Sequence, residues 1–184
     1  MSPAIRIALG AMVLGGALAC TKMKEPPVAA RNVLADSADQ VMFGISTFLT
    51  TDGVRKAKLQ SDTAYFFDDN ARIELRKVTM IFYTITGLKS STLTSRQGTY
   101  NRRTSTAEAR GEVEVVSEDG RHLTTPQLRF TQTTNEISSD SSFVLTTPDG
   151  RRLEGVGFRS DPNMKNIQTL HGTKGGGSFT LPGQ

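Results

Sequence analysis

The sequence of 184 residues has few of the side chains on which metal and redox chemistry depend: one cysteine, two histidines and no tryptophan. A single cysteine excludes an intramolecular disulfide and the usual multi-cysteine zinc or iron–sulfur site. The apolar runs are short, and none reaches the roughly 20 residues that a membrane-spanning helix needs. Mean hydropathy is −0.30, and the net charge of +4 comes from scattered basic residues. This charge suits contact with an acidic surface but is not the basic patch of a nucleic-acid-binding protein.

The motifs of the common enzyme classes are missing too. The sequence contains no G-x-S-x-G, H-E-x-x-H, P-loop or G-x-G-x-x-G pattern. His122 stands beside a turn and His171 precedes a glycine, so we interpret both as surface or strand-end residues. We therefore expect a protein that is not an enzyme, with no catalytic residue, no metal and no cofactor. A hydrolase of envelope polymers, with Ser or Asp against His122 or His171, is the most distant alternative.

The first 20 residues resemble a bacterial lipoprotein signal. Arg6 gives a short basic start, an apolar stretch follows over residues 7–16, and small residues lead to Cys20. The resemblance implies cleavage before Cys20 and attachment of diacylglycerol to its sulfur, with residues 1–19 as the signal peptide. An ordinary signal peptide followed by an unmodified cysteine is the alternative.

The rest of the chain divides by composition. Residues 20–40 comprise the lipidated cysteine and a tether that contains Pro26-Pro27 and has no sustained period. The alternative is that this segment packs on the domain that follows. We expect that domain to span residues 41–173 and residues 174–184 to form a flexible Gly-rich tail.

Turn signals recur through the domain at Asp52-Gly53, Gly87, Asp119-Gly120 and 148–150, which suggests an internal repeat of 30 to 34 residues. After each turn comes a leucine and then an aromatic residue: Leu59 with Phe66, Leu93 with Tyr100, Leu123 with Phe130, and Leu153 with Phe158. Hydroxyl side chains follow the first three leucines, at Ser61, Thr94-Ser95 and Thr124-Thr125. A polar turn and a second apolar run complete each unit, so each unit predicts two antiparallel strands. The pattern indicates an all-β fold, an open roll of about four strand-pair repeats.

Within these strands, period-two alternation predicts which side chains point inward. The inward set is Leu59, Val78, Met80, Phe82, Val113, Val115, Leu128, Phe130, Phe143 and Leu145.

Taken in order, these stretches resemble the LptC family, the periplasmic component of lipopolysaccharide export. The resemblance rests on residues 51–53, 57–62, 75–78, 82–83, 93–100, 109–115, 119–125, 128–130 and 154–162. Residues 109–115 match the family's alanine–glycine–polar–valine strand, and residues 154–162 its glycine-x-glycine stretch. One feature departs from the pattern, because LptC proteins typically carry an N-terminal transmembrane helix where this chain has Cys20.

The resemblance implies an open, V-shaped β-jellyroll (OstA-like) whose interior binds the acyl chains of lipid A. The inward set then lines a lipid-binding groove, and we expect those side chains to leave an open slot. The chain would pass lipid from an inner-membrane ABC transporter (LptB/LptF/LptG-like) to a periplasmic bridge protein (LptA-like). We expect it at the periplasmic face of the envelope, anchored by its lipid, most simply in the inner membrane.

The partner-binding edge is expected over residues 154–170, with Gly155, Gly157 and Phe158 as its residues. Gly155 and Gly157 lack side chains and so allow close backbone approach. The alternative is that these glycines only relieve a bend. A rival function is an envelope lipoprotein that serves as a structural or assembly scaffold. Its roll would be packed and would bind no lipid.

Overall fold

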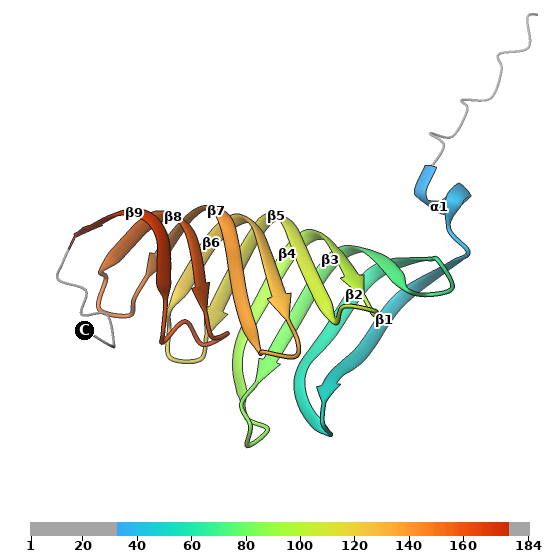
Figure 1. Ribbon diagram of the computed structural model, residues 1–184, viewed down its shortest axis with the longest axis horizontal. Coiled ribbons are helices and arrows are strands. Elements are labelled where there is room, and N and C mark those ends of the chain that lie inside the picture. The colour runs from blue at the N-terminus through green and yellow to red at the C-terminus, as the bar shows by residue number, and fades with distance from the viewer. Residues whose placement is uncertain (1–32, 177–184) are drawn as a thin grey trace, which may run out of the picture. The chain divides into compact units, whose positions relative to one another are not determined.

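The computed structural model describes residues 33–176, with side chains as far as His171. A five-residue helix is followed by nine strands that form one antiparallel sheet in sequential order, which confirms the all-β prediction (Figure 1). The elements are α1 Val33–Ser37, β1 Gln40–Thr51, β2 Val54–Phe67, β3 Arg72–Tyr83, β4 Lys89–Asn101, β5 Thr106–Ser117, β6 His122–Thr131, β7 Glu136–Thr146, β8 Arg152–Ser160 and β9 Gln168–Gly176.

The four turn signals lie at hairpin connections. Asp52 and Gly53 join β1 to β2 with φ values of 50° and 76°, a left-handed conformation that suits a tight turn. The other three turns join β3 to β4, β5 to β6, and β7 to β8. The repeats therefore correspond to β2–β3, β4–β5, β6–β7 and β8–β9, with β1 as an additional first strand. The sheet continues to Gly176, so the first three residues assigned to the Gly-rich tail lie in β9.

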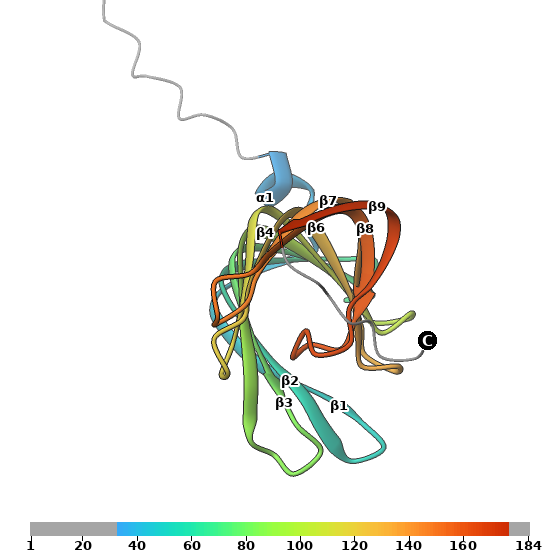
Figure 2. The same ribbon diagram turned by 90° about the vertical axis from the view of Figure 1, so that its left-hand side faces the viewer.

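Each strand is interrupted near its middle, and the interruptions lie next to one another across the sheet. Pairing skips one or more residues on each strand: Gly44, Asp62, Lys77, Arg96, Gly111-Glu112, Pro126, Asp140-Ser141, Gly157 and Leu170. We call this line the crease. Bulges bend a strand and increase its twist, and Lys77 and Glu112 adopt positive φ values of 51° and 50°. The sheet is consequently folded along the crease into two arms, as the end-on view shows (Figure 2).

Buried hydroxyl groups satisfy backbone carbonyls that the crease removes from the ladder. Ser61 Oγ lies 2.7 Å from the carbonyl oxygens of Thr63 and Arg76. Thr125 Oγ1 donates to the carbonyl of Ser142 at 2.9 Å, and Ser139 Oγ donates to that of Gln127 at 2.6 Å. Buried backbone groups need such partners. The recurrent Ser/Thr residues of the sequence thus stabilise the bend.

Candidate functional site

The space between the two arms is apolar and is lined by the inward set. All ten predicted side chains are buried, none more than 4% exposed, and all belong to one hydrophobic cluster. The alternation of inward and outward side chains is clear on β5, where Val113 and Val115 are buried while Glu112 and Glu114 are exposed. The inward orientation predicted from the alternation is therefore confirmed.

The expected open slot, in contrast, is not seen where Leu59, Leu75 and Leu128 meet. A cavity beside Leu75, Gly98 and Ala109 has a volume of about 10 Å³, room for one water molecule. Phe82 on β3 and Phe130 on β6 meet edge to face, with ring centroids 4.9 Å apart. Large side chains from the two arms interdigitate and fill the interior, so a lipid chain requires the arms to separate.

The β8–β9 connection adds to this filling, and sequence reasoning missed it. In Figure 2 the loop folds back inside the arch instead of lying on the outside. Pro162, Met164 and Ile167 are buried, although the residues around them are polar. The carboxylate of Asp161 holds the loop by accepting from the backbone N–H groups of Asn163 at 2.8 Å and Asn166 at 3.1 Å. Apolar residues spaced through a polar loop were the available signal.

Side chains hold the two arms against each other along a line that we call the seam. Gln132, 7% exposed after β6, donates from Nε2 to the carbonyl of Thr50 at 2.7 Å. Its Oε1 accepts from the hydroxyl of Tyr100 at 3.0 Å. Farther along, the buried Ser91 Oγ of β4 donates to the carbonyl of Pro162 at 2.6 Å. The strand order of the sheet ends at β1 and β9 and does not pair across the seam, so this boundary can open without loss of a β ladder.

The motifs noted in the sequence lie on successive strands of this folded sheet, and the sequence matches the model of a known family. The model of the family described as "Lipopolysaccharide-assembly, LptC-related" covers residues 7–176. The chain belongs to the LptC family. Proteins of this family are envelope components of lipopolysaccharide transport and not enzymes, and the chain therefore has a role in lipopolysaccharide transport. No curated protein matches the sequence.

In this LptC-family chain the strand that was expected to be a partner-binding edge is not at the edge of the sheet. β8, which contains Gly155, Gly157 and Phe158, pairs with β7 on one side and with β9 on the other. Phe158 is fully buried, with its ring 5.0 Å from that of Phe143. A Cβ at Gly157, whose φ is 74°, would lie 3.0 Å from Cβ of Leu170. Gly157 therefore permits the approach of the chain's own β9, and the free edge belongs to β9.

The opposite edge belongs to β1 and carries exposed apolar side chains. Phe43 is 78% exposed, and Met42 and Phe48 are also exposed. A long edge strand with unpaired backbone groups is a template for pairing with another chain. Within residues 33–176, the sheet of the LptC-family domain therefore has an unpaired edge strand at each end.

Charged groups lie mainly on the outer face and pair with one another. Glu108 accepts from Arg129 at 2.8 Å and from Arg110 at 2.7 Å, and the hydrogen bond from Arg129 is the main cause that lowers the pKa of Glu108. His122 pairs with Glu114 at the surface. Within residues 33–176, no group of three His, Cys, Asp or Glu side chains is placed to hold a metal ion.

The predictions for the N-terminal segment concern residues outside the described part. Cys20, the signal peptide and most of the tether precede Val33, so their interpretation stays a prediction. In the described part of the chain, no helix has the length and apolar character to cross a bilayer.

Proposed function

We propose that this LptC-family chain is a conduit that holds the acyl chains of lipid A between its two arms. The observation that carries the proposal is the seam: an apolar interior bounded by side-chain contacts and not by a β ladder. Each methylene group moved from water into such an interior contributes about 0.8 kcal/mol. Several acyl chains therefore supply enough free energy to separate the arms and displace their mutual contacts.

The two free edges give the conduit its direction. β1 pairs with the inner-membrane ABC transporter (LptB/LptF/LptG-like), and β9 pairs with the periplasmic bridge protein (LptA-like). Both contacts use strand addition, in which main-chain hydrogen bonds supply affinity. A lipid on Cys20 holds the chain at the periplasmic face of the inner membrane.

Photo-crosslinking tests the conduit directly. A benzoylphenylalanine at Phe130, which is 1% exposed, keeps an aromatic ring in the interior. The matched control is the same group at the adjacent, exposed Arg129. We expect lipopolysaccharide to be captured at position 130 and not at position 129. This pair is preferable to Val113 and Glu112, because those two residues both border an open depression of about 590 Å³ on the outer face.

A second function is favoured by one observation, the filled interior. The Phe82–Phe130 contact and the small cavity are what a scaffold lipoprotein with a packed roll requires. The same experiment separates the two functions. A scaffold gives no lipid adduct at either position, and equal capture at both positions removes the support for a lipid-lined groove.

A further inference from the structure

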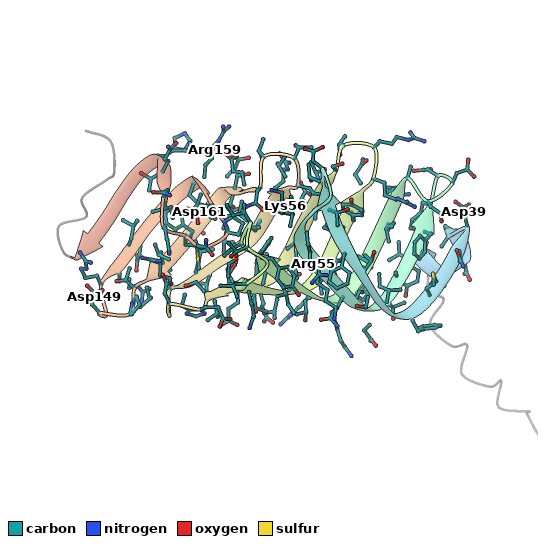
Figure 3. The ribbon with its side chains drawn as sticks, turned by 90° about the horizontal axis from the view of Figure 1, so that it is seen from below. Asp39, Arg55, Lys56, Asp149, Arg159 and Asp161 are labelled. Atoms are coloured by element: carbon teal, nitrogen blue, oxygen red, sulfur yellow. The ribbon has the colours of Figure 1, made fainter. Side chains whose placement is uncertain are left out.

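Three cations stand together at the start of β2, just after the β1–β2 turn: Arg55, Lys56 and Lys58. None of the three forms an ion pair with a described residue, whereas Lys77 and Lys89 have carboxylate partners on neighbouring strands. Figure 3 shows Arg55 and Lys56 from below, on the side toward which the β1–β2 hairpin projects in Figure 1. We call these three residues the basic cluster.

Aromatic rings hold Arg55 in place. Its guanidinium carbon lies 4.1 Å from the ring centroid of Phe48 and 5.5 Å from that of Tyr83. Stacking uses the faces of the guanidinium and leaves the N–H groups at its rim free to donate in the plane. An arginine restrained in this way loses little freedom when it binds a planar or tetrahedral anion.

A second stacked arginine shows why Arg55 differs. Arg72 lies over the ring of Phe67 at the same 4.1 Å. It also pairs with Asp68 at 3.4 Å and with Glu74, so its N–H groups are occupied by carboxylates of the chain. Arg55 has the same aromatic support but no ion pair with an Asp or Glu of the described segment.

The basic cluster lies at the border of the seam. Arg55 is in register with Thr50, and the carbonyl of Thr50 accepts the hydrogen bond from Gln132 that joins the two arms. Ala57 and Leu59, next on the same strand, are buried in the apolar interior. Arg55 itself lies over the exposed ring of Phe48, on the outer side of this border. An amphiphile with acyl chains between the arms and its polar group at this end of the strand therefore has Arg55 and Lys56 as the nearest cations of the strand end.

We propose that the basic cluster is a binding site for the phosphate of a phosphorylated sugar headgroup, with Arg55 as the oriented donor and Lys56 and Lys58 as supporting charges. The site rests on the proposed conduit function, because it takes the part of the lipid that stays outside the arms. Phosphate oxygens match the paired N–H groups of Arg55, and no carboxylate of residues 33–171 forms an ion pair with it.

The test compares two ligands that differ only in phosphate: diphosphorylated lipid A and its dephosphorylated form with the same acyl chains. Binding to the full chain in a nonionic detergent is measured for the wild type and for Arg55→Ala/Lys56→Ala. We expect the double variant to bind diphosphorylated lipid A about tenfold or more weakly, the effect of a lost charge-assisted hydrogen bond. Its affinity for the dephosphorylated lipid is unchanged.

The matched control is Arg102→Ala/Arg103→Ala, which removes two exposed charges from the β4–β5 turn. It keeps the full affinity for both lipids. Thermal melting checks the fold of each variant, and Lys56→Gln serves as a second variant because it leaves the stacked Arg55 in place.

Four outcomes overturn the site. They are equal loss for both lipids, equal loss in the control, displacement of bound lipid A by millimolar inorganic phosphate, and Arg55-dependent binding to phosphatidylglycerol vesicles with no discrimination between the two lipids. The third assigns the cluster to free phosphate and the fourth to a membrane surface. A wild type that binds neither lipid contradicts the conduit itself, whereas equal wild-type affinity for both lipids contradicts only the headgroup site.

Discussion

Replacing Gln132 with alanine tests whether side chains at the seam hold the two arms together. The substitution removes the hydrogen bonds to the carbonyl of Thr50 and from the hydroxyl of Tyr100. Each hydrogen bond contributes about 1 kcal/mol net to stability. The substitution also leaves the Thr50 carbonyl and the Tyr100 hydroxyl without this partner, so we expect the free energy of unfolding to fall by about 2–3 kcal/mol. For a domain of this size the melting temperature falls by about 4–10 °C.

The same substitution should strengthen lipid binding if the loaded protein has an open seam. Of the two bonds, only the one to Thr50 joins the arms, because Tyr100 and Gln132 lie on the same arm. This bond opposes opening, and the removal of about 1 kcal/mol from the closed state tightens binding by up to about fivefold. Urea denaturation gives the stability and displacement of a fluorescent lipid gives the affinity. Thr133→Ala, at the adjacent exposed position, is the control. A stability loss below about 0.5 kcal/mol, or equal effects in the control, would refute the role of Gln132 in holding the two arms together.

Two further predictions follow from single side chains. Cys20→Ser should abolish incorporation of radioactive palmitate, because the serine hydroxyl does not replace the thiolate that accepts diacylglycerol; unchanged labelling would contradict the anchor. Burial raises the pKa of Tyr100, so the unfolded chain loses this proton first and stability should fall as the pH rises above about 10. Tyr100→Phe should start from a lower stability but lose less of it between pH 8 and pH 11 in urea denaturation, and an unchanged pH dependence would contradict the assignment.

Local chemistry made much of the fold predictable. Turn residues such as Asp52-Gly53 determine where the chain reverses, and period-two alternation in stretches such as residues 112–115 determines which side faces inward. Both signals depend only on near neighbours in the sequence. This is why the strand pairs and the inward set agree with the structure.

What escaped prediction depends on contacts between distant residues. Phe82 and Phe130 close the interior from strands β3 and β6, and no pattern in either strand shows that the rings meet. Gln132 stands among polar residues after β6, and its partners Thr50 and Tyr100 come from β1 and β4. β1 was not predicted as a strand of the repeat because it precedes the first turn signal at Asp52-Gly53.

The crease has a mechanical consequence for the whole domain. Every strand runs through it, so each arm is a hydrogen-bonded plate made of nine half-strands. The bend is bridged in part by rotatable hydroxyl groups such as those of Ser61, Thr125 and Ser139. A change in the angle between the plates therefore requires these hydroxyl groups to rotate, and it leaves the hydrogen-bond ladders within each plate intact. Because hydrogen-bond ladders join the half-strands of each plate, we expect a wider angle at the β1 end to extend toward the β9 end.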